Sequence, residues 1–182
     1  MSKTNSKSLG NEYEREVAKV LSKWILGHDD RLLFWRNVHS GSISTIMNKK
    51  GKDGSNTSGD FQCLDLEYNY VLDNLHIDSK SYAKVNLFFI NEKNIKSNQI
   101  FKQWEKTVSE AKEVNKIPMM PVKIRDRVTP EFVLLPYSTY LNDINYIQYK
   151  LKDNMDNACT LVLLSDLLTI DFKEFFNTVT KF

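Results

Sequence analysis

Apolar residues in the first part of the chain recur at the spacing of one helix face. The stripe consists of Tyr13, Val17, Val20, Leu21 and Trp24. Positions at these intervals lie on one side of an α-helix, so the pattern predicts an amphipathic helix from Gly10. Gly27 marks its end, because glycine is common just beyond a helix C-terminus. The polar residues 1–9 are expected to be flexible.

Short apolar runs separated by polar segments predict strands along the rest of the chain. These runs are 31–38, 60–66, 75–82, 118–125, 131–137 and 159–165. Residues 67–74 have the composition of a turn connection, so we expect the second and third strands to form a hairpin-like pair. That pairing would bring Asp60 and Asp78 to the same open end.

Helices are predicted in three later segments. Residues 97–115 carry a second apolar stripe made of Ile100, Trp104, Val108, Ala111 and Val114. Residues 138–151 are predicted to be helical, and residues 171–179 to form a short terminal helix with Asp171 as its N-cap. Helices around several apolar strands indicate an α/β fold, with a short mixed β-sheet flanked by helices.

The length of the chain limits the number of domains. With 182 residues, one domain with a substantial core is expected, and a second compact domain is not. We therefore predict a flexible N-terminus over 1–9 and a single domain over 10–182. Within that domain, we expect the core over 10–135 and an α/β C-terminal extension over 136–182.

Charge and cysteine usage exclude several classes of protein. The formal net charge of +2 is too small for an overall field that attracts nucleic acid, so a polyanion would need a local patch. Cys63 and Cys159 stand far apart in apolar surroundings, which argues against a disulfide framework and favours a reducing compartment. The N-terminus lacks the apolar core of a signal peptide, and no stretch is long enough to span a bilayer. We expect an intracellular, cytoplasmic protein without a membrane partner.

The segment 39–59 is rich in serine, glycine, asparagine and lysine. A loop of this length inside a compact domain is more often functional or mobile than idle. Lys49, Lys50 and Lys52 have the composition of a flap that contacts phosphates. A solvated loop without a ligand explains these lysines equally well.

Asp78 and Lys80 are two residues apart at the end of the third predicted strand, which places them on one face of it. Alone, such a pair is a solvated ion pair of little energetic value. Asp60 begins the preceding strand, and Glu14 lies beside the apolar stripe of the first helix. Carboxylates are ligands that Mg²⁺ prefers, and a nearby lysine can orient or deprotonate an attacking water. Together these residues predict the site of a metal-dependent phosphodiesterase.

Four segments of the chain occur in the order seen in PD-(D/E)XK nucleases. They are GNEYEREVAKVL, RNVHSGS, SGDFQCL and HIDSKSY. The first resembles the opening helix of the archaeal Holliday-junction resolvases, where a glycine is followed four residues later by Glu-Arg-Glu. The resemblance covers about residues 10–135. It implies a restriction-endonuclease-like core, a Mg²⁺ cofactor that Mn²⁺ can replace, a DNA substrate that is branched in the resolvases, and a homodimer.

The resemblance also implies roles for individual residues. It makes Glu14 the helix carboxylate, Asp60 the aspartate of the PD element, and Asp78-Ser79-Lys80 the (D/E)-x-K tripeptide. The three acids, with the carbonyl of Ser79 as a further ligand, would hold one or two metal ions. Lys80 would position or deprotonate the water that attacks the phosphorus.

The segment before the aspartate is expected to bind the DNA backbone. The predicted contacts are Arg36, Ser40, Ser42, Lys49, Lys50 and Lys52, of which the first three resemble the family's Arg and Ser/Gly-rich segment. Four features depart from the family pattern. The tripeptide begins with Asp78, a less common choice, and the loop before Asp60 is long for a compact resolvase. Gly59 stands in place of the proline of the PD element, and the residues after Tyr137 have no counterpart in the resolvases.

Other acidic residues leave alternatives open. Glu16 and Glu12 are rivals to Glu14, which only its register against Gly10 favours. Strand alternation places Asp65 on the face opposite Asp60, so we expect it, like Glu67, to lie at a solvated strand end.

Further polar and aromatic residues receive weaker interpretations. His76 shares the face of Asp78 and is expected to be packed or exposed to solvent rather than functional. Gln99 and Gln103 lie near the start of a helix where some relatives carry a glutamine close to the site. Trp35 and Trp104 are expected in the core rather than as platforms for base stacking.

The sequence therefore predicts a metal-dependent endodeoxyribonuclease that resembles the Holliday-junction resolvases of recombination and repair. One alternative is a restriction-like or repair nuclease that acts on duplex DNA. The other is a DNA-binding protein on the same fold that does not cleave.

Overall fold

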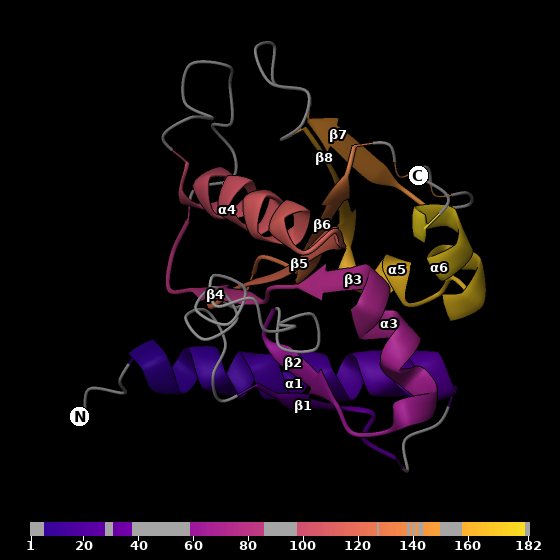
Figure 1. Ribbon diagram of the computed structural model, residues 1–182. Coiled ribbons are helices and arrows are strands. Elements are labelled where there is room, and N and C mark those ends of the chain that lie inside the picture. Colours follow the sequence, from indigo (N-terminus) through magenta and orange to yellow (C-terminus); the bar gives the residue numbers. More distant parts are fainter. Residues whose placement is uncertain are drawn as a thin grey trace.

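The computed structural model describes residues 6–27, 31–37, 59–85, 98–126, 128–137, 139, 141, 144–149 and 158–180 (Figure 1). In chain order, the elements are α1 Ser6–Leu26, β1 Phe34–Arg36, β2 Phe61–Cys63, η2 Leu66–Tyr68, α3 Asn69–Asn74, β3 Leu75–Ile77, β4 Lys80–Tyr82, α4 Gln99–Glu113, β5 Ile117–Ile124, β6 Phe132–Pro136, β7 Tyr146–Tyr149, β8 Cys159–Leu163, α5 Leu164–Leu167 and α6 Phe172–Thr180. The α/β class and the mixed sheet agree with the prediction.

The main sheet has the strand order β3-β5-β6-β8-β7, and β4 also pairs with β5. Both β3 and β4 run parallel to β5, with Leu75 opposite Ile117 and Lys80 opposite Val122. They therefore act as one edge strand that is interrupted between Ile77 and Lys80. The remaining pairs are antiparallel, and β8 lies against β6, so the C-terminal segment completes the same sheet.

Helices cover both faces of this sheet, with α4 on one face and α1 on the other (Figure 1). Alternation along β5 supplies both cores, because successive side chains of a strand point to opposite faces. Met119 packs in the core that contains α1, β1 and α6, whereas Met120 packs in the core under α4. Both methionine side chains are almost fully buried.

The two long helices confirm the periodicity argument. α1 buries Tyr13, Val17 and Leu21 of the predicted stripe, and it begins at Ser6, four residues before the predicted start. Asn98 caps the N-terminus of α4, because its side chain accepts a hydrogen bond from the backbone N–H of Ile100 at 2.9 Å. Asp171 caps α6 as predicted, because its Oδ1 accepts the backbone N–H groups of Lys173 and Glu174 at 2.9 and 3.1 Å.

The expected hairpin between the second and third strands is wrong. β2 pairs antiparallel with β1 in a separate two-stranded sheet, and β3 pairs with β5. The segment between β2 and β3 is not a turn, because η2 and α3 occupy it and Val71 and Leu72 of α3 are buried. A helical crossover of this kind separates the strands instead of joining them as neighbours.

The predicted helix over 138–151 is also wrong for its described part. Residues 146–149 form β7, which pairs antiparallel with β8 from Tyr146 opposite Val162 to Tyr149 opposite Cys159. Aromatic and β-branched residues favour a strand once a partner edge is available. That edge is provided by β8, which lies beyond the segment that shows the helical spacing.

The two tryptophans predicted as core residues differ in the structure. Trp104 of α4 is 1% exposed and packs in the core between α4 and the sheet, as predicted. Trp35 is 43% exposed, which contradicts the prediction. It lies on the outer face of the β1–β2 pair, while its neighbour Phe34 takes the buried face. None of the helices in the described ranges has the length and apolar character that crossing a bilayer requires.

Candidate active site

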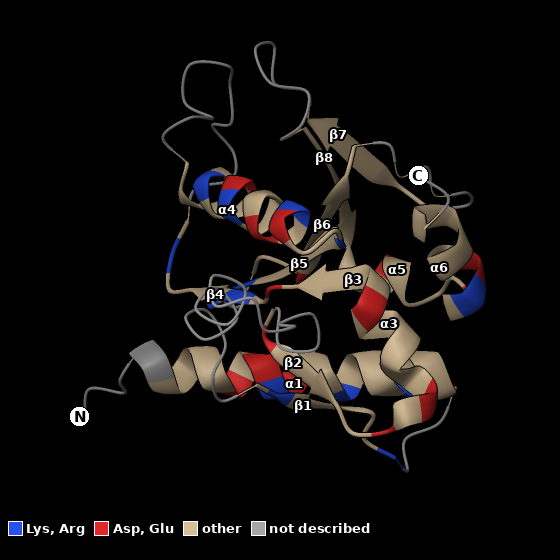
Figure 2. Cartoon of the chain, viewed as in Figure 1, with Lys and Arg blue, Asp and Glu red and all other residues tan. Residues whose placement is uncertain are grey.

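The interruption between β3 and β4 places two polar residues inside the protein. Asp78 and Ser79 are buried at this break, and Lys80 begins β4. The backbone N–H of Asp78 donates to the carbonyl of Met119 at 3.0 Å, so the edge strand stays attached to β5 through the break. Figure 2 shows acidic and basic residues meeting where β3 adjoins β4, and further acidic residues in the middle of α1.

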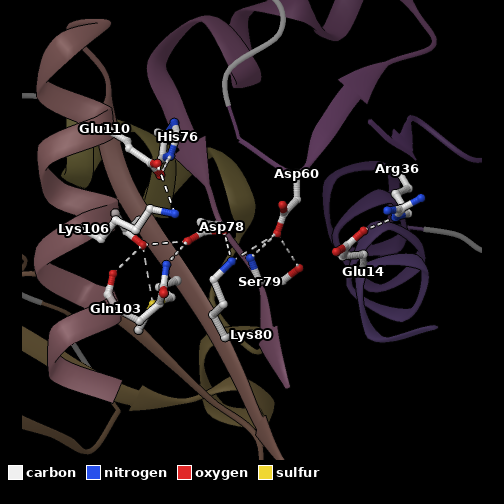
Figure 3. A network of polar contacts seen from close by, with 12 residues as sticks. Glu14, Arg36, Asp60, His76, Asp78, Ser79, Lys80, Gln103, Lys106 and Glu110 are labelled. Atoms are coloured by element: carbon white, nitrogen blue, oxygen red, sulfur yellow. Dashed lines mark hydrogen bonds and ion pairs between the residues drawn. The ribbon is translucent and has the colours of Figure 1, made fainter. Parts of the chain in front are cut away.

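Every oxygen of the Asp78 carboxylate has a partner. Oδ1 contacts the Lys80 ammonium, and Oδ2 accepts hydrogen bonds from Thr107 Oγ1 at 2.8 Å and Gln103 Nε2 at 3.1 Å (Figure 3). Burial alone would raise the pKa of Asp78, but the charge of Lys80 and the hydrogen bonds from Lys80 and Thr107 hold it below its usual range. Asp78 is therefore a buried, ionised carboxylate that two residues of α4 fix in place.

Asp60 approaches Asp78 from the other side of the edge strand. Its backbone N–H donates to the carbonyl of Ile77 at 2.9 Å. Its Oδ2 accepts hydrogen bonds from the backbone N–H and the hydroxyl of Ser79 at 2.7 and 3.1 Å. Burial and then the negative charge of Asp78 raise the pKa of Asp60 to about 7, although Lys80 offsets part of the effect.

Gly59 is the residue that allows this close approach. Its φ of +82° lies in the left-handed region, and a Cβ atom at this position would lie 2.7 Å from the carbonyl oxygen of Ile77. Proline fixes φ near −65° and could not adopt this conformation. The replacement of the family's proline by glycine therefore has a steric cause in this chain.

Lys80 lies between the two aspartates. Its ammonium contacts Asp78 and is 4.0 Å from Oδ2 of Asp60. Burial by itself would lower the pKa of Lys80, but the charges of Asp78 and Asp60 raise it. In this arrangement Lys80 is a charged hydrogen-bond donor.

Glu14 of α1 pairs with Arg36 of β1, and both side chains are largely buried. Figure 3 shows the Glu14 carboxylate on the side of this pair that faces Ser79 and Asp60. Its charge is also among the causes that raise the pKa of Asp60. The rival Glu16 instead pairs with Lys123 at 2.6 Å and is 45% exposed. Of the two glutamates, Glu14 is the one beside the aspartates.

The comparisons with known proteins bear on this group of residues. A family model described as "Phage putative PDDEXK endonuclease" matches residues 5–181. The chain belongs to this family. The comparisons with curated proteins and with solved structures found no match. Membership supports the predicted PD-(D/E)XK resemblance and the restriction-endonuclease-like fold, while the narrower likeness to Holliday-junction resolvases stays a prediction.

The match also extends over the C-terminal segment. Residues after Tyr137, which have no counterpart in the resolvases, lie within the matched range of this PD-(D/E)XK family. This agrees with the structure, in which β8 pairs with β6 and Phe175 of α6 packs in the same core as Tyr13 of α1.

The PD-(D/E)XK family implies a metal ion, and the donor atoms present test whether one fits. Asp60, Asp78 and the carbonyl of Ser79 offer only oxygen, which suits Mg²⁺, an ion usually bound by one or two carboxylates and several waters. Among the residues that the structure describes, no three histidine, cysteine, aspartate or glutamate side chains are grouped so that they could hold a metal. The oxygen donors of the two aspartates suit a hard cation in their chemistry, but Glu14 is paired with Arg36 and does not join them as a third carboxylate.

Several predicted residues lie away from the aspartates or cannot be placed. Ser40, Ser42, Lys49, Lys50 and Lys52 lie outside the described residues, so their predicted DNA contacts stay predictions. His76 is packed, as expected, and its Nε2 is 3.8 Å from Glu110. Asp65 pairs with Arg31 at 3.0 Å and caps η2.

Gln103 received little weight from the sequence, and Thr107 was missed. Both residues contact Asp78 from one side of α4, where residues four apart are neighbours. Thr107 is fully buried beside Trp104 and Val108 of the apolar stripe. A polar residue within that stripe was the signal that could have indicated it.

Replacing Thr107 by valine is expected to lower the free energy of unfolding by about 1–3 kcal/mol, because the ionised Asp78 loses a buried donor. Urea denaturation at pH 7 measures the change. Thr107→Ser is the matched control, since it keeps the hydroxyl and should be the more stable variant despite losing a methyl group. Equal or greater stability of Thr107→Val would contradict a donor role for the hydroxyl.

Proposed function

We propose that the protein is a metal-dependent endodeoxyribonuclease that hydrolyses DNA phosphodiester bonds. The observation that carries this proposal is the approach of Asp60, Asp78 and Lys80 at the interrupted edge strand of a chain in a PDDEXK endonuclease family. A fold kept only for binding would have no need to bury two neighbouring carboxylates, since each costs free energy to desolvate.

The cofactor of this proposal is Mg²⁺, which Mn²⁺ can replace. Asp60 and Asp78 would hold the ion, with the Ser79 carbonyl and Glu14 as further donors. When bound, the ion supplies Lewis-acid stabilisation of charge on the phosphate and lowers the pKa of a bound water. The chain itself prepares the ligands, because Ser79 fixes Asp60 while Thr107 and Gln103 fix Asp78.

Lys80 is the proposed catalytic residue. Its ammonium lies beside both aspartates and can donate hydrogen bonds to the attacking water or to a phosphate oxygen. As a charged group it orients the nucleophile and stabilises negative charge on phosphorus. Arg36, Ser40, Ser42, Lys49, Lys50 and Lys52 are the proposed contacts to the DNA backbone.

The proposed substrate is branched DNA, cut by a homodimer in recombination or repair. This part of the proposal rests on the likeness of residues 10–21 to the opening helix of the resolvases. Two opposed strands at a junction need two active sites, which a dimer provides.

Lys80→Met is expected to reduce cleavage at least about 100-fold, within the range of a lost proton-transfer or positioning group. The assay compares a four-way junction with a linear duplex of the same sequences, in Mg²⁺, Mn²⁺ and EDTA. Lys173→Met is the matched control, because Lys173 is an exposed residue of α6, which lies apart from the junction of β3 and β4 (Figure 1). Full activity of Lys80→Met would refute the site.

The two substrates separate the candidate functions. Preferential cutting of the junction supports a resolvase, and equal cutting of both supports a restriction-like or repair nuclease. Binding of DNA without cleavage in either metal would leave only the DNA-binding alternative.

A further inference from the structure

Arg36 is part of the candidate site itself, whereas a residue that only contacts the DNA backbone could lie outside it. On β1 it is opposite Phe61, the residue after Asp60, and the backbone N–H of the next residue, Asn37, donates to the Asp60 carbonyl at 2.7 Å. Its Nε donates to Oε2 of Glu14, and the two side chains are only 18% and 15% exposed. The pair is thus built into the wall that holds Asp60.

The charges at the site are not balanced. When Asp60 is ionised, Glu14, Asp60 and Asp78 supply three negative charges, whereas Lys80 and Arg36 supply two positive ones. Lys80 contacts Asp78, and Arg36 contacts Glu14. Asp60 shares Lys80 with Asp78, and its Oδ2 is 4.0 Å from the Lys80 ammonium, farther than Asp78 is. The site therefore carries one excess negative charge. A bound divalent cation would reverse the sign of this excess, and the single negative charge of a phosphodiester would then neutralise it.

We propose that Arg36 is a displaceable counter-ion, which leaves Glu14 when a divalent cation binds and then contacts a phosphate of the bound DNA strand. The inference rests on the proposed function. It makes Arg36 a positioning residue that couples loading of the cation to binding of the substrate.

Two physical arguments favour exchange over a static pair. A guanidinium and a divalent ion are both positively charged, so they repel each other when they contact the same carboxylate. The repulsion is strong at Glu14 because this carboxylate is largely buried and water screens the charges only weakly. The planar fork of arginine also matches the geometry of phosphate as well as that of carboxylate, so Arg36 has an alternative partner when DNA is present.

The first experiment measures Mn²⁺ binding by calorimetry, without DNA. Arg36→Gln is expected to bind Mn²⁺ about tenfold more tightly than wild type, because Glu14 is released from its counter-ion. In the Glu14→Gln background, the same arginine substitution should give no gain. A gain that persists there would reflect net charge alone and would overturn the proposal.

Arg31→Gln is the matched control for this measurement. Arg31 also pairs with a carboxylate, Asp65 at 3.0 Å, but this pair lies away from the aspartates of the site. Its substitution should leave Mn²⁺ affinity unchanged. If Arg31→Gln tightens binding as much as Arg36→Gln does, the exchange at Glu14 is not the cause.

The second experiment measures the salt dependence of DNA binding in the Lys80→Met background, where cleavage is blocked. With Mn²⁺ present, Arg36→Gln should reduce the slope of log affinity against log salt by about 1, the value of one lost phosphate contact. In EDTA the slope should not change, since Arg36 is then held by Glu14. An equal loss in both conditions, or no loss in either, would overturn the exchange.

These results separate the inference from the proposed function. Wild-type protein that cleaves DNA and binds Mn²⁺, but gains nothing from Arg36→Gln, refutes the exchange alone. Wild-type protein that neither binds Mn²⁺ nor cleaves DNA refutes both.

Discussion

Asp60→Asn is expected to abolish DNA cleavage and, at the same time, to stabilise the metal-free protein above pH 7. Asparagine keeps an oxygen that can accept the hydrogen bonds from Ser79. It removes the charge that burial and Asp78 make unfavourable. The same substitution therefore removes a proposed metal ligand and relieves an electrostatic cost of the folded state.

The sign of the pH dependence follows from the pKa of Asp60. Its ordinary value of 3.8 is raised to about 7 in the folded protein, so the folded state binds the proton more tightly than the unfolded chain. The stabilisation is complete below pH 4 and is lost as the pH rises to about 7. Above that pH, wild type lacks a stabilisation of a few kcal/mol that the asparagine variant retains, since each pH unit of such a shift corresponds to about 1.4 kcal/mol.

Urea denaturation in EDTA at pH 5 and pH 8 tests this prediction. Asp60→Asn should exceed wild type in stability at pH 8, and the difference should shrink at pH 5. Added Mg²⁺ should stabilise wild type but not the variant, since a ligand stabilises only the state that binds it. Asp65→Asn is the control, because Asp65 pairs with Arg31 at a partly exposed position. A variant that is less stable than wild type at pH 8 would contradict the assigned charge state.

Gly59→Ala is expected to lower the free energy of unfolding by about 2–4 kcal/mol, from an unfavourable left-handed φ and from overpacking. The new Cβ would lie 2.7 Å from the carbonyl oxygen of Ile77, and backbone cannot move aside as the end of a flexible side chain can. Any relief moves Asp60 away from Ser79, so cleavage should fall as well. Gly59→Pro, which restores the family's residue, should be worse.

Gly10→Ala provides the matched control. Gly10 lies within α1, and a Cβ there has no atom within 4 Å. Alanine should therefore stabilise the helix by about 0.5–1 kcal/mol without affecting cleavage. Denaturation of both variants, with cleavage assays alongside, measures the contrast. If Gly59→Ala is as stable and as active as wild type, the steric account of this glycine is wrong.

The sequence by itself determined the local features of the protein. The stripes of α1 and α4 were readable because a helix buries one face of its own segment, and the burial of Tyr13 and Trp104 confirms them. The contact between Asp78 and Lys80 could be predicted because residues two positions apart in an extended chain lie close together on the same face. The order of the four motifs was enough to predict the nuclease family that the family model supports.

Partners distant in the chain were decided only by the tertiary structure. Only the register against Gly10 favoured Glu14 over Glu16 in the sequence, whereas in the structure Arg36 on β1 pairs with Glu14 and Lys123 on β5 pairs with Glu16. Trp35 could not be assigned to the outer face without the pairing of β1 with β2.

The same holds for the environment of the two aspartates. Asp78 lies at a break between two strands that both pair with β5, and Thr107 reaches Asp78 because α4 packs over β5. The physical reason is that periodicity records whether a side chain is buried, not against what it is buried. The pKa of Asp60 and its proposed chemistry depend on which groups surround it, and periodicity does not reveal those groups.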